Sequence, residues 1–211
     1  MSHTPNPPSG ARPQRADAQR SIARILDAAL EGLSADPEVS MGAIARRAGV
    51  TRATVYVHFS DRESLIAAVT HRAIAEATEV IDEAQPAVGE PVEALARVTS
   101  AAWRTLARFH ALVAINAELP AEEFHHLHGS ALGALQPLIE RGQAAGAFRA
   151  DVPPAWHLAS LLALIHGASA EVHAGRIAED QVEDALVAGV VGALTADGTT
   201  GTAHGTTGGS R

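Results

Sequence analysis

The segment 51–58, TRATVYVH, is rich in side chains that could contact nucleic acid. An arginine can donate paired hydrogen bonds to guanine or bind a phosphate, and threonine and tyrosine hydroxyls can reach phosphate oxygens. Ala53 and Val55 can supply the apolar contacts that so short a helix needs. The polar side chains then have few duties in a core, unless the segment is an ordinary helical hairpin with a solvated face. The candidate DNA contacts are Thr51, Arg52, Thr54, Tyr56 and His58.

A second stretch with chemical potential is AEEFHHLHGS, residues 121–130. Glu122, His125 and His128 follow one another at intervals of three, so they fall on neighbouring faces of a helix. This is the spacing of di-iron bundles, which also require a second Glu-x-x-His motif and two further glutamates. The nearest partner, 171–173, has the wrong spacing, and the chain has no zinc helix, phosphate loop or nucleophile elbow. A metal-binding bundle or enzyme is therefore the alternative hypothesis, and we expect no catalytic residue, metal or cofactor.

The segment 51–58 forms the second half of a helix-turn-helix pattern. In 41–47, apolar residues recur three and four positions apart on one face. Ser40 is placed to cap this first helix, and Thr51 is placed to cap the second. Gly49 lies between them, and glycine readily adopts the left-handed backbone that ends a helix. Such a motif can set its second helix in a DNA major groove.

Two arginines on the flanking helices are further candidate DNA contacts. Arg20 lies on a polar face of the first helix, where phosphate contact and plain solvation are both possible. Arg62 lies in the first turn of a long helix, where Ser60 and Glu63 form a capping-box pattern. A helix whose first turn contacts phosphates and whose far end lies in another domain would act as a lever.

The remainder of the chain also has helical periodicity, interrupted by proline and glycine. No stretch is long and apolar enough to cross a membrane. The composition predicts a disordered arm over 1–16 and a disordered tail over 195–211. Helices are expected at 18–33, 60–84, 91–106, 108–118, 121–145, 154–174 and 178–194.

The charge of the chain is unevenly divided. Its 211 residues carry a net charge of −8 and no cysteine, which suits a cytoplasmic protein without disulfides. Residues 1–74 hold nine arginines against seven carboxylates, whereas residues 75–211 hold seven against seventeen. Because attraction to phosphate is screened within about 10 Å, the local balance matters more than the total. The basic N-terminal part is therefore compatible with DNA, and the acidic remainder should face away from it.

The run GAIARRAGVTRATVYVHFSDRESLIAAV resembles the signature of the tetracycline-repressor (TetR) family of bacterial transcriptional regulators. Together with the preceding helix, the resemblance extends over about a third of the chain. Ala53 stands where the family commonly has glycine and Arg62 where it commonly has lysine, which puts sequence preference in doubt rather than DNA binding. The matching positions are Ile44, Ala45, Ala48, Gly49, Val50, Tyr56, His58, Phe59 and the run 63–65.

The resemblance implies an all-α, two-domain, homodimeric regulator, and we interpret it as a repressor. Residues 17–63 would bind DNA, 64–84 would connect the domains, and 85–194 would bind an effector and the second subunit. Two recognition helices would read a roughly palindromic operator. An effector that favours the spread-apart arrangement would tilt the long helix and weaken operator binding.

The C-terminal half contains the mixture of apolar and polar side chains that lines ligand pockets. Arg104 and Arg108 are the nearest cations, so a highly anionic effector is disfavoured and a neutral or cationic, largely apolar compound is expected. Simple core filling is the alternative for each residue. The candidate effector contacts are Trp103, Phe109, Asn116, Phe124, His128 and His166.

The last two helices are candidates for a two-fold interface between subunits. The run 167–170, GASA, offers a small-residue surface for close packing, and the last helix is apolar on one side. Without the family resemblance, packing within one subunit explains the pattern equally well. The candidate interface residues are Leu161, Ile165, Val187, Val190, Val191 and Leu194.

Overall fold

The computed structural model describes residues 11–116 and 119–195 and confirms the all-α fold. An isolated β-bridge joins Phe148 and Thr195. No helix in the described part of the chain is long and apolar enough to cross a membrane. The elements are α1 (Ala11–Ala35), α2 (Met41–Arg47), α3 (Arg52–His58), α4 (Arg62–Glu83), α5 (Pro91–Leu106), the 3₁₀ turn η1 (Ala107–Phe109), α6 (His110–Asn116), α7 (Ala121–Leu127), α8 (Gly129–Ala144), α9 (Pro154–His173) and α10 (Glu179–Leu194).

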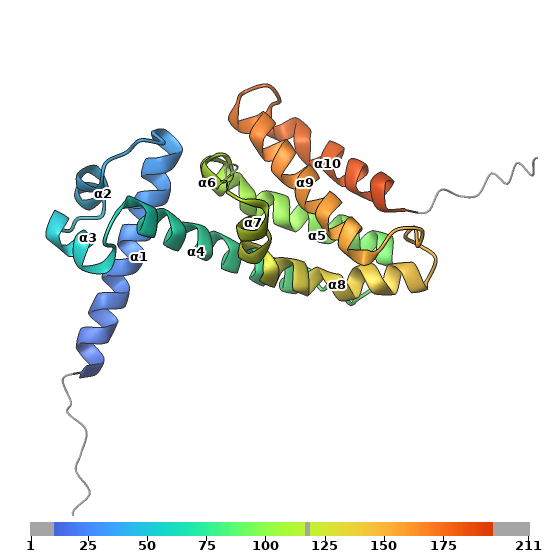
Figure 1. The fold of residues 1–211 in the computed structure, drawn as a ribbon, viewed down its shortest axis with the longest axis horizontal. Coiled ribbons are helices and arrows are strands. Elements are labelled where there is room, and N and C mark those ends of the chain that lie inside the picture. Colours follow the sequence, from blue (N-terminus) through green and yellow to red (C-terminus); the bar gives the residue numbers. More distant parts are fainter. Residues whose placement is uncertain (1–10, 117–118, 196–211) are drawn as a thin grey trace, which may run out of the picture.

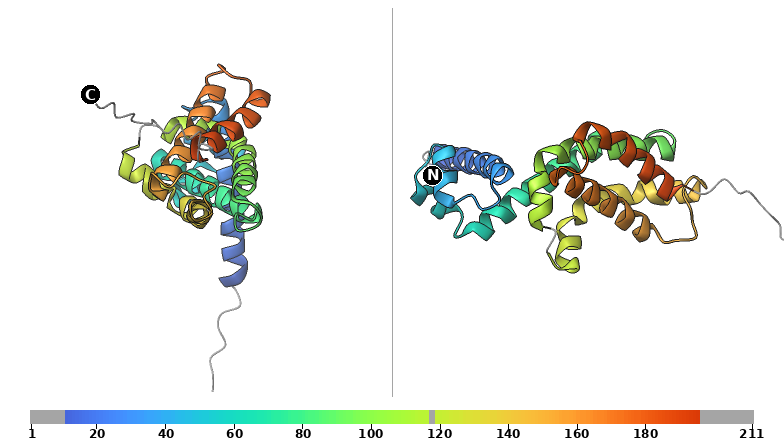
Figure 2. Two further views of the ribbon diagram at one scale, coloured as in Figure 1. Left: turned by 90° about the vertical axis from the view of Figure 1, so that its right-hand side faces the viewer. Right: turned by 90° about the horizontal axis from the view of Figure 1, so that it is seen from above.

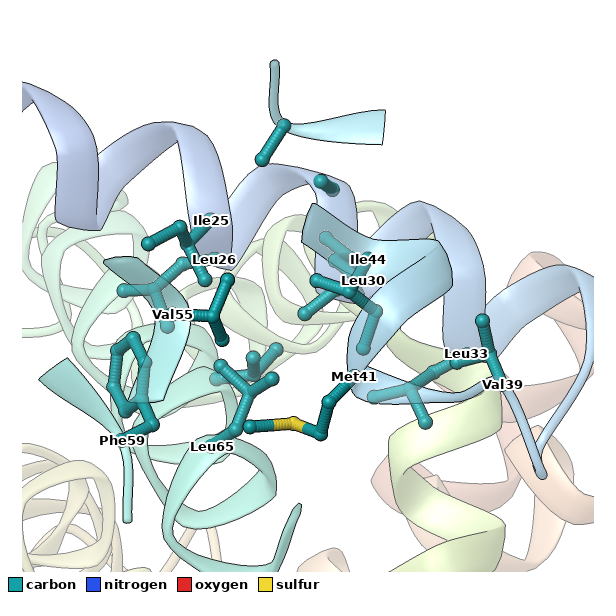
Figure 3. Packing of buried hydrophobic residues seen from close by; sticks show 14 of the residues in the cluster. Ile25, Leu26, Leu30, Leu33, Val39, Met41, Ile44, Val55, Phe59 and Leu65 are labelled. Carbon is teal, nitrogen blue, oxygen red and sulfur yellow. The ribbon is translucent and has the colours of Figure 1, made fainter. Parts of the chain in front are cut away.

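The first three helices form the N-terminal domain around one apolar core. Figure 3 shows side chains of α1, including Ile25 and Leu30, meeting Ile44 of α2 and Val55 of α3. The helix α1 starts at Ala11, so residues 11–16, expected in a disordered arm, are helical. Pro13 is tolerated there because the first turn needs no N–H donor. The rest of the expected arm, and all but the first residue of the expected tail, lie outside the described residues.

The helix-turn-helix has the caps that the sequence predicts. The Ala43 N–H donates to Ser40 Oγ at 3.3 Å, and the Thr54 N–H donates to Thr51 Oγ1 at 3.0 Å. Between the two helices, Gly49 has a φ of +65°, where a side chain would be strained. The angle between α2 and α3 is therefore set by local backbone chemistry as well as by the core.

The first turn of α4 differs from the expected capping box by one residue. Asp61, rather than Ser60, is the N-cap, and its carboxylate accepts the Ser64 N–H at 2.7 Å. The reciprocal bond runs from the Asp61 N–H to Ser64 Oγ at 3.3 Å. The Ser64 N–H and then the Ser60 hydroxyl hold the pKa of Asp61 below its usual value. An ionised carboxylate is a stronger acceptor than a hydroxyl at a helix N-terminus, which explains why Asp61 and not Ser60 is the N-cap.

The C-terminal domain is a bundle of α5 to α10 around a second core. Figures 1 and 2 show α4 leading from the N-terminal domain into this bundle, where it packs on α5 and α8. The helix expected over 121–145 is divided at His128, where both the ring and the backbone N–H bond the Phe124 carbonyl, at 2.8 and 3.3 Å, and Gly129 follows. The helix expected over 108–118 begins instead with η1, and α6 covers only 110–116.

Candidate nucleic-acid interface and ligand cavity

The outward face of α3 carries a paired arginine and tyrosine. Arg52 Nη2 donates to the Tyr56 hydroxyl at 3.3 Å, and its guanidinium lies over the Tyr56 ring at 5.4 Å. The hydrogen bond that Arg52 donates to the Tyr56 hydroxyl raises the pKa of Arg52. Both side chains are exposed, and an arginine stacked on a ring keeps donors free for a guanine or a phosphate.

An apolar strip beside this pair was missed in the sequence. Val57 has 80% of its surface exposed, and Ala53, expected to pack inward, is exposed one helical turn away. The helical period could have indicated the exposure of both residues, because each lies two positions, or about 200°, from the buried Val55. Apolar side chains at such positions can contact the methyl group of thymine. The strip therefore extends the DNA-reading surface expected from the polar residues.

The two threonines of this face are engaged with each other. The hydroxyls of Thr51 and Thr54 lie 2.7 Å apart, while Thr51 also caps the helix. His58 ends α3, is half-buried, and has its ring 6.4 Å from that of Phe59. Arg52, Tyr56 and Val57 of this helix are thus exposed, whereas Thr54 and His58 are half-buried.

The two flanking arginines make contacts inside the protein. Arg20 is exposed and pairs with Asp17 one turn earlier, an exposed pair that a phosphate could replace at small cost. Arg62 is half-buried and donates to the carbonyl of Pro37, in the loop between α1 and α2. Its guanidinium therefore connects that loop to α4, and its predicted phosphate contact stays a prediction.

A cavity of about 90 Å³ lies in the C-terminal domain, between α4, α5, α6, α8 and α9. We call it the inner cavity. Four of the six predicted effector contacts line it: Phe109, Asn116, His128 and His166. The remaining lining is aliphatic except for Thr70, which accepts a hydrogen bond from Asn116 Nδ2 at 3.1 Å.

Two histidines form the polar end of the inner cavity. The rings of His128 and His166 meet edge to face, with their centroids 4.9 Å apart. The centroid of the Phe124 ring lies 4.4 Å from that of His128 and 5.0 Å from that of His166. Burial, followed by repulsion from His128, lowers the pKa of His166 to about 4, and burial lowers that of His128 as well. Both rings are uncharged at neutral pH, so none of the described residues that line the cavity is ionised. Since Nδ1 of neutral His128 donates to the Phe124 carbonyl, its Nε2 is an acceptor.

Neither tryptophan lines the inner cavity. Trp103, predicted as an effector contact, is buried in the C-terminal core and borders a shallow surface hollow beside Glu183 instead. Trp156 lies at the start of α9 with 60% of its surface exposed. Phe124, the other predicted contact outside the lining, acts through the two histidine rings that it touches.

Most of the residues expected at a subunit interface face inward. Leu161 and Ile165 line the inner cavity, while Val190 and Leu194 are fully buried in the C-terminal core. These four cannot contact a second subunit, because α9 and α10 use those faces to close their own bundle. The half-buried candidates are Val187 and Val191.

The outer side of α9 and α10 carries a different apolar surface. A shallow groove of about 350 Å³ runs between the two helices, and two of its aliphatic side chains, Leu164 and Ile177, are 38% and 40% exposed. Small residues let another helix approach such a groove closely. We call this surface the outer α9–α10 groove, and its lining includes Leu164, Gly167, Ile177, Ala185 and Gly189.

The possible metal cluster does not assemble. Across 11–116 and 119–195, the structure brings no three His, Cys, Asp or Glu side chains together in a way that could hold a metal ion. Glu122 and His125 lie at the surface of α7, whereas His128 is held inward by its bond to the Phe124 carbonyl. The Glu-x-x-His spacing therefore reflects the exposed face of a short helix.

The chain is similar in sequence to known bacterial regulators. Residues 25–69 match the pattern of bacterial regulatory proteins of the tetR family. The chain is 28% identical to the HTH-type transcriptional repressor NicS of Pseudomonas putida over 159 residues, 68% of this chain and 72% of NicS. It is 44% identical to the uncharacterized HTH-type regulator TtgW of Pseudomonas putida over 61 residues, 28% of this chain and 46% of TtgW.

A third relative links sequence and fold. The repressor LfrR of Mycolicibacterium smegmatis is 35% identical over 95 residues, 45% of this chain and 47% of LfrR. The match therefore spans less than half the length of TtgW and of LfrR. The crystal structure of LfrR from Mycobacterium smegmatis in complex with proflavine aligns with a TM-score of 0.66 at 23% identity, covering 89% of this chain and 100% of LfrR. The two chains share their fold over nearly the whole length.

Proposed function

This chain belongs to the TetR family of bacterial transcriptional regulators, and from that premise we propose that it is a repressor that binds double-stranded operator DNA. The observation that carries the proposal is the exposed face of α3, where Arg52 and Tyr56 flank the strip of Ala53 and Val57. This helix enters the major groove, where the guanidinium reads guanine and the apolar strip contacts thymine methyl groups. Members of the family are regulators and not enzymes.

The repressor acts as a homodimer on a roughly palindromic site. Two copies of α3 must reach half-sites about one helical turn, roughly 34–36 Å, apart. The outer α9–α10 groove supports this assembly, because it is apolar, contains small residues and faces away from the protomer's own core. A second copy of the same surface would complete a two-fold four-helix contact.

A small, largely apolar effector occupies the inner cavity and releases the operator. The aliphatic lining supports this role, as does the absence of ionised side chains from that lining. Phe109 and Leu112 line the cavity and also pack into the N-terminal core, so a ligand that displaces them changes how the N-terminal domain rests on α6. LfrR, whose structure holds proflavine, supports a small-molecule effector.

The DNA-binding proposal is tested by selecting bound sequences from a random duplex pool with the purified full-length chain. The selected operator should contain two inverted half-sites. Val57→Ser should weaken binding to it by about 1 kcal/mol, roughly fivefold, and leave non-specific DNA unaffected, because a methyl contact carries sequence information. Val88→Ser, at an exposed valine of the loop before α5, is the matched control. Equal losses on both kinds of DNA would remove Val57 from base reading, and no enrichment of any sequence would contradict the function.

A further inference from the structure

A second hollow lies on the other side of the Thr70–Asn116 pair. We call it the outer groove: an open space of about 560 Å³ between the first half of α4, the end of α6, and α7. Thr70 and Asn116 line both this groove and the inner cavity, so the hydrogen bond between them lies where the two spaces meet. The two spaces therefore adjoin at Thr70 and Asn116.

The two spaces differ in polarity. The outer groove has an apolar floor that includes Ile66 and Ile115, and its rim carries the carboxylates of Glu63 and Glu123. Both carboxylates are exposed, and neither has an ion-pair partner among the described residues. The cation of the rim, Arg62, is turned to the Pro37 carbonyl. The groove thus offers negative charge beside apolar surface, whereas the inner cavity offers no charge.

Size also argues for joint use of the two spaces. An engineered cavity of about 150 Å³ is known to hold one benzene molecule, so the inner cavity at about 90 Å³ takes no more than a short chain or a small ring without expansion. A larger effector must leave part of itself outside. The outer groove is where that part would lie, because the two spaces share Thr70 and Asn116.

We propose that the inner cavity and the outer groove form one site for a monocationic amphiphilic amine. The apolar tail passes between Thr70 and Asn116 into the inner cavity, and the ammonium head stays in the outer groove near Glu63 and Glu123. The lining of the groove sets two carboxylates against the single guanidinium of Arg62, so an anionic head would meet more negative than positive charge. The inference rests on the proposed function only for the effect on DNA, since binding of the amine is a property of the C-terminal domain and α4.

The same arrangement gives the head group a short route to the DNA-binding domain. Glu63 is adjacent in the chain to Arg62, which lines the outer groove and holds the loop between α1 and α2 through Pro37. An ammonium drawn to Glu63 lies beside this contact and repels the guanidinium. The occupied site therefore favours a different seating of the loop on α4, which is the differential contact that release of the operator requires.

The test is calorimetric titration of the DNA-free, full-length chain with three probes of one tail length: octyltrimethylammonium, octyl sulfate and octanol. We expect the ammonium to bind at least about tenfold more tightly than the sulfate. Glu123→Gln should remove most of that preference and leave octanol binding unchanged. Glu122→Gln, which alters a neighbouring carboxylate of α7 outside the groove, is the matched control and should change nothing.

A second variant tests where the tail lies. Ala131 lines the inner cavity but not the outer groove, so Ala131→Leu should fill tail space and weaken octyltrimethylammonium severalfold while sparing tetramethylammonium. Equal binding of ammonium and sulfate, or an unchanged affinity in Glu123→Gln or Ala131→Leu, would overturn the inference. Release of the operator by octanol alone would contradict the amine site and leave the proposed function intact. Binding of the amine as expected, with no operator found, would support the amine site and contradict the proposed function.

Discussion

At the scale of single residues, arginines divide between contacts inside the protein and a surface left for DNA. Arg52 keeps its guanidinium at the surface, stacked on Tyr56. Arg62, in the first turn of α4, donates a hydrogen bond to the Pro37 carbonyl. Both carry the same charge, so their different roles follow from geometry: the α1–α2 loop brings a carbonyl within reach of one and not of the other.

Arg62→Ala should therefore act on folding more than on phosphate binding. It removes a charged hydrogen bond to a carbonyl, at a cost of about 1–3 kcal/mol in the free energy of unfolding. We expect a lower melting temperature, and an unchanged slope of log K against log salt when operator binding is measured below that temperature. A slope smaller by about one unit with an unaltered melting temperature would instead assign Arg62 to a phosphate.

His166 should make stability depend on pH. Its pKa is about 4 in the folded protein and about 6.5 in the unfolded chain, so only the unfolded chain gains this proton as the pH falls between those values. This contribution is fully present above about pH 6.5 and is lost toward pH 4. In His166→Phe, the drop in melting temperature between pH 7 and pH 5 should be shallower than in the parent. His173→Phe, at an exposed position of α9, should keep the parent slope.

At the scale of elements, η1 and α6 connect the cavity to the N-terminal domain. Phe109 is buried where these two elements meet, and it belongs to the lining of the inner cavity and to the N-terminal core at once. Arg108 beside it pairs with Glu76 of α4, and Arg72 of α4 pairs with Asp27 of α1. Because Glu76 also pairs with Arg72, these ion pairs connect η1 through α4 to α1.

Phe109→Leu should uncouple the effector from the operator. The smaller side chain fills less of the boundary, so operator affinity should stay within about twofold while the effector concentration for half-release rises severalfold. Phe148→Leu is the control, since Phe148 is equally buried in the C-terminal core but does not line the cavity. Equal shifts in both variants, measured by fluorescence anisotropy of labelled operator, would deny Phe109 a specific role.

The elements also show which signals the sequence carried. The bounds of α5 were predicted correctly, because Pro91 marks a helix start and the apolar stripe is one-sided. The break at His128 was missed, because it depends on a bond from the ring to a carbonyl. The α9 residues predicted at the interface, Leu161 and Ile165, are buried inside the protomer, and the pattern could not show this because the helix is apolar on both sides: Leu161 lines a cavity inside and Leu164 lies outside. The cavity itself depends on the spacing of five helices, which no local pattern encodes.

At the scale of the whole molecule, the proposed contact with a second subunit is the outer α9–α10 groove. Ala185→Arg, on the exposed side of α10, should give a folded monomer with weak operator affinity. Val190→Asp should instead unfold the protomer, since Val190 is fully buried in its own core and an unpaired carboxylate there costs several kcal/mol. Sedimentation and thermal melting distinguish the two outcomes. A stable dimer of Ala185→Arg would move the interface elsewhere.

The inner cavity has a consequence for the volume of the protein. A void of about 90 Å³ corresponds to roughly 50 mL/mol, within the range of volume changes that accompany unfolding. Hydrostatic pressure favours states that eliminate such a void, whether by flooding it or by collapse. A ligand that fills the void removes this volume difference. Compression and effector should therefore oppose each other in their influence on the folded state.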